Sequence, residues 1–339
     1  MFQGQYSVGE QSEIFLIEEL CTQAMEEQKI EKEKITSVRK LTGDASTRRY
    51  FRVHTTSNTY VACLASAGED SFALMRDILN SANVRVPKLF DVSISRGFFL
   101  EEDLGDKTFI KMLSGLESES EQLSRYQQAV DQMINIHKID VAMPGVPFST
   151  LHFDEVKLMQ EVRMTLDYFL GSYIKCENIL AIKEIEKLFR DIVVKIAAMP
   201  KVVCHRDYHS RNIMVKSDEL IIIDFQDARQ GPRQYDLASL VDDCYFKIEA
   251  VNKEKLKRYY FENSDSKESY EEFLLNYDLV AIQRLFKAIG SFSYIYESRK
   301  DVRYLKYIGY AFENMRIKLM GLKDYRKRTL ILSDIYYGS

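Results

Sequence analysis

The sequence predicts an α+β fold with two lobes: a small N-terminal lobe built on an antiparallel sheet and a large helical C-terminal lobe. Segments with the two-residue alternation of strands lie mostly in the first hundred residues. Beyond Leu104 and Gly105, apolar residues recur almost throughout at helical spacing. Only 14 glycines and 5 prolines occur among 339 residues, which favours long helices over frequent turns.

The N-terminal lobe is expected to cover residues 1–103. Residues 10–28 space their apolar side chains at helical intervals and predict an opening helix. Residues 70–82 predict a second helix. Alternating segments bounded by turn-forming residues predict the strands, which are 35–41, 48–55, 59–65, 88–94 and 97–101.

The C-terminal lobe is expected to cover residues 104–339, with a cleft where it meets the first lobe near residue 103. One strand-rich stretch, 201–224, interrupts its helices. The expected helices are 119–138, 153–173, 178–198, 235–247, 252–263, 268–297 and 303–320.

The composition indicates an ordinary soluble protein. Charged residues make up 29% and the net charge is −4, which gives no overall electrostatic reason to expect nucleic acid. The five cysteines form no CxxC pair, which favours reduced thiols. The sequence shows neither a signal peptide nor an apolar run near the ~20 residues that a membrane span needs. We therefore expect a cytoplasmic protein.

The residues that suggest chemistry lie in 202–229, which reads as an apolar strand, a polar loop and a strand hairpin. The loop contains His205-Arg206-Asp207, Asn212 follows five residues after the aspartate, and Asp224 ends the hairpin. Phosphoryl transfer from ATP needs a carboxylate that orients the acceptor hydroxyl and oxygen ligands that hold Mg²⁺. Asp207 suits the first role, and Asn212 and Asp224 suit the second. The spacing is that of kinases.

Two other interpretations of this stretch are weaker. A polar loop that merely caps a hairpin would need four residues to occupy these places by accident. A zinc site formed by His205, His209 and Asp207 lacks a further soft ligand at zinc spacing. The bilobal pattern and the motif together predict a protein-kinase-like fold that uses ATP and Mg²⁺.

Four segments resemble motifs of the aminoglycoside phosphotransferase/choline kinase superfamily. The resemblance is greatest to the bacterial anomeric kinases of cell-wall recycling, which phosphorylate N-acetylmuramate and N-acetylglucosamine. It extends from about residue 36 to about residue 300. The segments are 41–53, 99–106, 205–212 with 223–229, and 231–245.

The resemblance implies roles for individual residues. Asp207 corresponds to the catalytic base, Asn212 and Asp224 to the Mg²⁺ ligands, and Asp236 to a buried acid that braces the catalytic loop. The segment 99–102 corresponds to the hinge whose backbone bonds adenine. The nucleotide-binding residues so implied are Gly43, Asp44, Ser46 and Thr47 in a phosphate-covering turn, with Leu100 and Glu102 in the hinge.

The sequence departs from the kinase pattern at the third strand, where a lysine usually holds the α- and β-phosphates. No lysine lies between Lys40 and Lys88, and Cys63 or Leu64 stands at the expected place. Arg49 shares a strand face with apolar residues that favour burial, so we hypothesise that it replaces the lysine. A solvated arginine pair is an equally good interpretation.

The helices after residue 245 are expected to shape the acceptor pocket. Gln283 and Arg284 are polar within an apolar helix, and His209 and Arg211 follow the catalytic aspartate. A cation such as Arg284 or Arg163 would suit the lactyl carboxylate of N-acetylmuramate. Ordinary surface ion pairs are the alternative for either one.

The sequence thus predicts an ATP-dependent phosphotransferase with a small-molecule acceptor, most simply the anomeric hydroxyl of an N-acetylated amino sugar. An aminoglycoside or choline-type kinase is the alternative, since acids at Asp242, Asp243 and 261–272 would suit a polycation. A nucleotide-binding pseudokinase that acts as a scaffold is the alternative of another class. The sequence does not indicate an oligomeric state.

Overall fold

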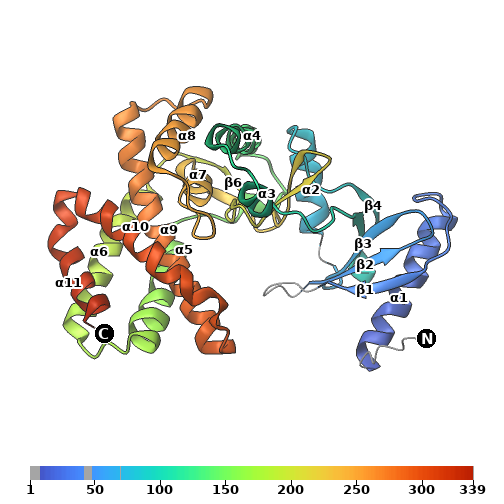
Figure 1. Ribbon diagram of the computed structural model, residues 1–339, viewed down its shortest axis with the longest axis horizontal. Coiled ribbons are helices and arrows are strands. Elements are labelled where there is room, and N and C mark those ends of the chain that lie inside the picture. Colours follow the sequence, from blue (N-terminus) through green and yellow to red (C-terminus); the bar gives the residue numbers. More distant parts are fainter. Residues whose placement is uncertain (1–7, 42–47, 69, 339) are drawn as a thin grey trace.

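The computed structural model describes residues 8–41, 48–68 and 70–338. Figure 1 shows two lobes side by side, a small one that contains a sheet and a larger one made mainly of helices. This arrangement confirms the predicted α+β, protein-kinase-like fold. No helix among the described residues is both long and apolar enough to cross a membrane.

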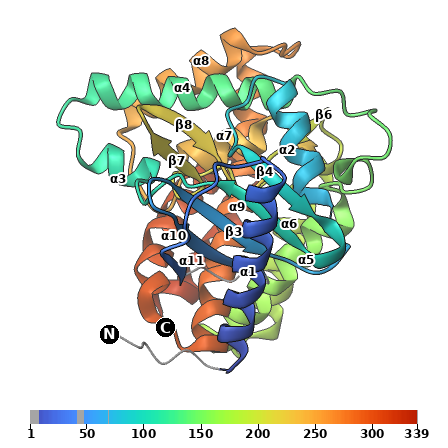
Figure 2. The same cartoon turned by 90° about the vertical axis from the view of Figure 1, so that its right-hand side faces the viewer.

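The small lobe is built on a five-stranded antiparallel sheet with the strand order β1-β2-β3-β5-β4. Helix α1 (Val8–Glu26) covers one face of this sheet, as Figure 2 shows. Phe51 and Val53 point toward α1 because alternate residues of a strand face the same side. The strands are β1 (Ser37–Lys40), β2 (Arg49–His54), β3 (Thr59–Leu64), β4 (Leu89–Ser93) and β5 (Phe98–Glu102).

Helix α2 (Ser71–Ser81) packs against both the small lobe and the end of the catalytic hairpin. Its residue Phe72 packs edge-on against Phe99 of β5, with ring centroids 5.3 Å apart. The same ring stacks on Phe225, which follows Asp224, at 5.1 Å. The Asp-Phe pair of the motif is therefore held by apolar packing from the other lobe.

The large lobe is organised around α9 (Tyr270–Arg299), a helix of 30 residues that is buried along much of its length. It packs against α5, α6, α7 and α10. The π-helix Leu166–Tyr173 continues α5. The other helices are α3 (Phe109–Ser114), α4 (Glu119–His137), α5 (Glu155–Thr165), α6 (Ile179–Ala197), α7 (Gln234–Val241), α8 (Ala250–Asn263), α10 (Ile308–Gly321) and α11 (Arg326–Tyr337).

Helices α3 and α11 and strand β9 were not predicted, and α7 is shorter than the expected 235–247. Helix α7 ends at Val241 because the next two side chains have partners elsewhere. Asp242 accepts a hydrogen bond from the Tyr277 hydroxyl at 2.7 Å. Asp243 accepts one from the Ser210 backbone at 3.0 Å. These tertiary contacts outweigh the helical periodicity.

Two small two-stranded sheets position the catalytic residues. Strand β6 (Lys201–Cys204) pairs with β9 (Arg229–Pro232), and β7 (Ile213–Lys216) pairs with β8 (Glu219–Ile222). In the second pair Ile213 lies opposite Ile222, so the residues just outside the pair also meet. Ile223 donates its backbone N–H to the Asn212 carbonyl at 3.1 Å. This register brings Asn212 next to Asp224.

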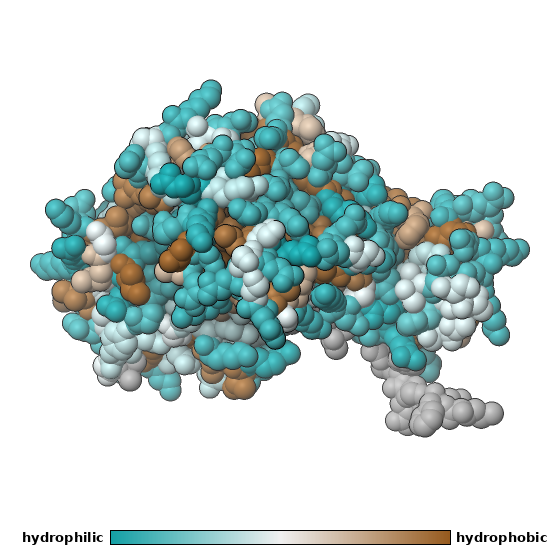
Figure 3. Space-filling view, turned by 45° about the horizontal axis from the view of Figure 1, so that its top comes forward, coloured by the Kyte–Doolittle hydropathy of each residue, from teal (hydrophilic) through white to brown (hydrophobic). Residues whose placement is uncertain are grey.

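We propose that the lobe boundary lies near residue 103, at the end of β5. Lys216 Nζ, at the tip of the catalytic hairpin, donates to the Asp103 carbonyl at 2.8 Å and to the Glu102 carboxylate at 3.0 Å. The large lobe therefore contacts the segment that joins the two lobes directly, through Lys216. On the face seen in Figure 3, hydrophilic side chains predominate and hydrophobic ones are scattered.

Candidate active site

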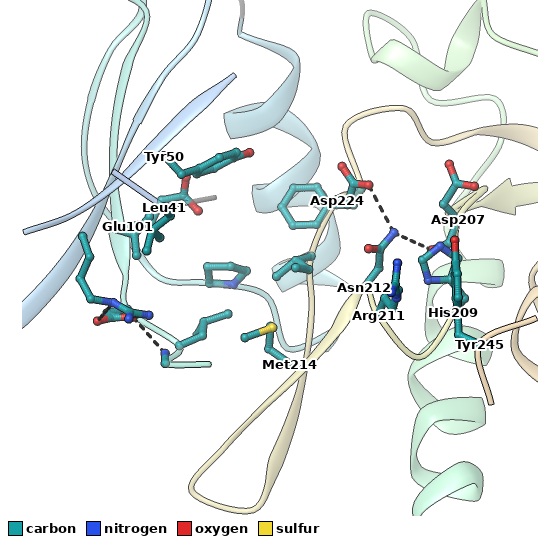
Figure 4. Close-up of a pocket in the computed structure, with 18 of the residues that line it drawn as sticks. Leu41, Tyr50, Glu101, Asp207, His209, Arg211, Asn212, Met214, Asp224 and Tyr245 are labelled. Atoms are coloured by element: carbon teal, nitrogen blue, oxygen red, sulfur yellow. Dashed lines mark hydrogen bonds and ion pairs between the residues drawn. The ribbon is translucent and has the colours of Figure 1, made fainter. Parts of the chain in front are cut away.

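A cavity of about 570 Å³ lies between the lobes. Figure 4 shows Tyr50 and Glu101 of the small lobe on one side, facing Asp207, Asn212 and Asp224 on the other. The cavity also reaches the end of α9 and the segment that follows it. Its lining there includes Ile295, Arg299, Asp301, Arg303 and Tyr304.

The catalytic loop is held by a fully buried carboxylate, as expected for Asp236. Its two oxygens accept the backbone N–H groups of His205 at 2.6 Å and Arg206 at 2.9 Å. The His205 ring bonds the Ile223 carbonyl at 2.9 Å, which ties the loop to the hairpin. Arg206 has a positive φ of 84°, a conformation that needs such support.

The Asp207 carboxylate lies between two cations. Lys287 Nζ is 3.3 Å from Oδ1, and Arg206 Nε is 3.7 Å from Oδ2. Burial opposes ionisation of Asp207, but the charges of Lys287 and Arg206 outweigh it and hold its pKa well below its usual range. The carboxylate is therefore charged, and it lines the cavity.

Asn212 and Asp224 fit a hard divalent cation. The Asn212 side chain lies 3.2 Å from Asp224 Oδ2 and also reaches the Asp207 carbonyl at 3.0 Å. Gln226 donates to the other Asp224 oxygen at 2.7 Å. Within the described chain no Lys, Arg or His forms an ion pair with Asp224, although its carboxylate is exposed in the cavity. Oxygen ligands and an uncompensated charge are what Mg²⁺ requires.

The hinge prediction is only partly matched by the structure. Leu100 is fully buried against α1, and its strand is paired on both sides. Strand alternation turns the side chain of its neighbour Glu101 toward the cavity instead. That the hinge backbone at Leu100 contacts the nucleotide stays a prediction. Glu102 lines the cavity, and Arg85 binds its carboxylate at 2.8 Å. The backbone N–H and carbonyl of Leu104 make no hydrogen bond to described residues.

Arg49 does not face the cavity, so the hypothesis that it replaces the missing lysine loses its geometric basis. Its Nε lies 2.6 Å from Glu13 of α1, and its side chain is 43% exposed. The buried face of β2 is covered by α1, whereas the opposite face meets the cleft. Arg48 precedes β2 on that cleft side, is 6% exposed, and places its guanidinium 5.1 Å from the Phe72 ring centre.

Four predicted nucleotide-binding residues lie outside the described residues. They belong to the segment predicted as a phosphate-covering turn and are Gly43, Asp44, Ser46 and Thr47.

The predicted acceptor residues separate into two groups. His209 and Arg211 line the cavity, and the Arg211 guanidinium stacks on Tyr245 at 4.1 Å. Gln283 and Arg284 are buried in α9 outside the cavity lining. Gln283 donates to Glu161 at 3.1 Å.

The remaining charged candidates, Arg163 and Asp242, form ion pairs within the protein. Arg163 is exposed and lies 3.8 Å from Glu186, in agreement with the surface ion pair considered for it. Asp242 is buried between Lys253 and Lys318, at 2.7 and 3.2 Å, so its charge is compensated within the protein. It offers no free acid to a polycation.

Sequence reasoning missed two charged residues near the site, Lys287 and Glu101, whereas a third, Arg52, is one of the second-strand arginines that could be expected to face the cleft. Lys287 contacts Asp207. The sequence feature that could have identified Lys287 is its position one helical turn after Arg284. Glu101 is buried at the cavity wall, and burial raises its pKa to about 8 although Arg48 opposes the increase. Arg52 lines the cavity and binds Asp103 at 2.9 Å.

Comparisons with known proteins agree with this geometry. N-acetylmuramate/N-acetylglucosamine kinase of Pseudomonas aeruginosa is 31% identical over 278 residues, which cover 77% of this chain and 78% of that one. The protein of the same name from Pseudomonas putida is 28% identical over 273 residues, 77% of each chain.

Solved structures share the fold. Choline kinase from Streptococcus pneumoniae superposes with a TM-score of 0.58 at 15% identity, over 91% of this chain and 99% of that chain. Spectinomycin phosphotransferase in complex with ADP and spectinomycin gives 0.57 at 17% identity, over 93% and 98%. Residues 37–273 match the model of the APH group, described as the phosphotransferase enzyme family. The chain therefore belongs to the phosphotransferase enzyme family.

Proposed function

We propose that this enzyme transfers the γ-phosphoryl group of ATP to the anomeric hydroxyl of an N-acetylated amino sugar, N-acetylmuramate or N-acetylglucosamine. The observation that carries the proposal is the charged Asp207 carboxylate, which lines one cavity together with Asn212 and Asp224. The curated relatives named as kinases of these two sugars supply the acceptor. The dependence on ATP is the reason to propose a cytoplasmic location.

Each residue of the chain has a separate task in this proposal. Asp207 accepts a hydrogen bond from the acceptor hydroxyl and takes its proton as the new P–O bond forms and the bond from the γ-phosphorus to the bridging oxygen of ADP breaks, which releases ADP. Asn212 and Asp224 would hold Mg²⁺, which when bound neutralises charge on the phosphates. The Leu104 backbone, which has no partner among the described residues, is placed to bond the adenine edge. Because phosphoryl transfer has a loose transition state, positioning matters more than base strength.

The proposal is tested by Mg²⁺- and acceptor-dependent release of ADP. The acceptor panel is N-acetylmuramate, N-acetylglucosamine, its methyl glycoside, glucose, choline and kanamycin. We expect turnover with the first two and none with the methyl glycoside, because its anomeric oxygen is blocked. Turnover with kanamycin or choline alone would replace the acceptor and keep the chemistry.

A matched variant tests the role of the carboxylate. Asp207→Asn preserves shape and removes the proton acceptor, so turnover should fall by about 10²–10⁴-fold while ATP still binds. If the variant keeps wild-type turnover, the assignment of Asp207 is wrong. ATP binding without turnover on any acceptor would favour the pseudokinase alternative.

A further inference from the structure

Glu101 of β5 carries a buried carboxyl group with an unsatisfied oxygen. The residue is 6% exposed, and its Oε1 atom makes no hydrogen bond to any described residue. Its neighbour Glu102 differs, because Arg85 and Lys216 both bind that carboxylate. Buried polar atoms without a partner are rare in folded proteins and indicate a missing ligand or water. The Glu101 carboxyl is therefore a candidate contact for a bound molecule.

This carboxyl group lies at the wall of the cavity between the lobes. Glu101 stands opposite Val61 in the pairing of β3 with β5, and residues directly opposite one another point to the same side of a sheet. Val61 lines the same cavity, whereas the side chain of Leu100 packs on the other side, toward α1. Figure 4 shows Glu101 beside Leu41 and Tyr50 on the small-lobe side of the cavity. A molecule in the cavity can therefore reach the Glu101 carboxyl.

The apolar lining of this part of the cavity suits a flat aromatic base. Leu41 and Val61 contribute apolar side chains from the small lobe, and Met214 and Ile223 contribute them from the large lobe. A base that lies between these two pairs has apolar groups against both of its faces. Predominantly apolar walls with a few polar groups are usual in cofactor sites.

Polar groups for the edge of such a base lie where the two lobes join. The backbone N–H and carbonyl of Leu104 make no hydrogen bond to described residues. Leu104 follows Glu101 by only three residues, and both line the cavity. This wall therefore offers backbone groups that can bond one part of the base edge and a carboxyl oxygen that can bond the neighbouring part.

Purine bases differ at position 6 in the group that they present to a carboxyl oxygen. Adenine carries an amine there, which donates, beside the acceptor N7, whereas guanine carries a carbonyl and so presents two acceptors. Hypoxanthine, the base of ITP, carries the same carbonyl. An ionised carboxyl only accepts hydrogen bonds, and a neutral one offers one donor beside an acceptor. Adenine has a donor for either form, but a base with a carbonyl leaves at least one carboxyl oxygen without a donor.

We propose that Glu101 is a specificity-determining residue that recognises position 6 of the nucleotide base: one of its carboxyl oxygens accepts a hydrogen bond from the amine of ATP. The inference rests on the proposed function, in which ATP is the phosphoryl donor. Nucleotides with a carbonyl at this position, such as ITP and GTP, leave a buried carboxyl oxygen unsatisfied, which is costly. Glu101 therefore makes the enzyme prefer ATP to these nucleotides.

The test compares kcat/KM for ATP with that for purine riboside triphosphate, which lacks the amine, and with that for ITP. In the wild type ATP should exceed both. Glu101→Leu removes both oxygens at similar volume and should lower each of the two ratios about tenfold or more. Glu101→Gln retains an accepting oxygen, so its kcat/KM for ATP should stay within about threefold of the wild-type value.

Glu219→Gln is the control for these ratios. Glu219 is an acid of the same type that is 62% exposed on β8 and does not line the cavity, so its two ratios should equal those of the wild type. Unchanged ratios in Glu101→Leu would overturn the inference and leave water as the partner of Oε1. A loss of ATP turnover in Glu101→Gln as large as that in Glu101→Leu would overturn it as well, because the accepting oxygen would then not be the group that matters.

A binding measurement separates this inference from the proposed function. Absence of turnover with either sugar would refute the proposed function alone. The role of Glu101 would then be judged by the melting temperature with Mg²⁺-ADP and with Mg²⁺-IDP. ADP should raise the melting temperature more than IDP does in the wild type, and the difference should shrink in Glu101→Leu. Equal effects of the two nucleotides on the wild type, or the same difference in both proteins, would overturn the inference.

Discussion

Lys287 Nζ lies 3.3 Å from Oδ1 of Asp207, although the two residues are 80 positions apart in the sequence. The contact joins α9, which is expected to shape the acceptor pocket, to the carboxylate that orients the acceptor. Because Lys287 helps to hold the pKa of Asp207 far below its usual range, the wild-type carboxylate should stay ionised at any pH at which the protein is folded.

Replacing Lys287 by Met should therefore expose the titration of Asp207. The pKa of the carboxyl rises when its nearest cation is removed, and the acid limb of the pH profile of kcat moves toward neutral pH. The profile is measured from about pH 5 to pH 9 under saturating substrates. Lys187→Met serves as the control, since Lys187 is 62% exposed on α6 and pairs with Glu184. Superimposable profiles for the two variants would show that Lys287 does not tune Asp207.

Asp224→Ala should abolish activation by the metal. A direct ligand is worth at least as much as the outer contacts that cost 10–100-fold, so we expect turnover to fall by about 100-fold or more. Gln226→Ala removes only the group that donates to Asp224 Oδ1 at 2.7 Å. It should raise the Mg²⁺ concentration needed for half-maximal activity and largely restore turnover at high Mg²⁺. Normal Mg²⁺ activation of Asp224→Ala would contradict the metal assignment.

The catalytic loop could be predicted from the sequence because its functional residues lie close together along the chain. Asp207, Asn212 and Asp224 lie within 18 positions, and the pairing of β7 with β8 brings both ends of the hairpin together. The bracing role of Asp236 came from the family resemblance instead, and its carboxylate accepts two loop N–H groups. Short-range geometry leaves few alternatives for such a motif.

The face of the sheet that meets the cleft could not be predicted from the sequence. Alternation correctly separates Arg49 from Arg48, but it does not say which face meets the cleft. That choice is made by α1, which packs on Phe51 and Val53. The same helix buries Leu100 and leaves its neighbour at the cavity wall. Both side-chain directions are set by a contact between segments far apart in the sequence.

The cleft-side arginine should matter more for ATP than the outer one. Arg48→Ala removes a buried cation beside Phe72, and we expect the KM for ATP to rise about tenfold if Arg48 stands in for the lysine. Arg49→Ala removes an exposed pair with Glu13, which is worth about 0–1 kcal/mol, and should leave KM unchanged. Melting temperatures of both variants separate loss of folding from loss of binding. Equal KM values would mean that neither arginine replaces the lysine.

Glu101 should make the stability of the protein depend on pH. Burial raises its pKa from 4.5 to about 8, so between these values the folded protein holds a proton that the unfolded chain releases. The native state then binds more protons, and the free energy of unfolding falls as the pH rises through this window. The stabilising contribution is complete below about pH 4.5 and is lost on passing pH 8.

Glu101→Gln should remove this part of the pH dependence, because the amide stays neutral in both states. At pH 9 the variant should exceed the wild type in free energy of unfolding by on the order of 1–3 kcal/mol, with little difference at pH 5. Urea unfolding at pH 5, 7 and 9 measures the effect. Glu219→Gln is the control, since Glu219 is 62% exposed and should follow the wild type. A slope between pH 5 and pH 9 that is as steep in Glu101→Gln as in the control would show that Glu101 is already ionised in the folded protein.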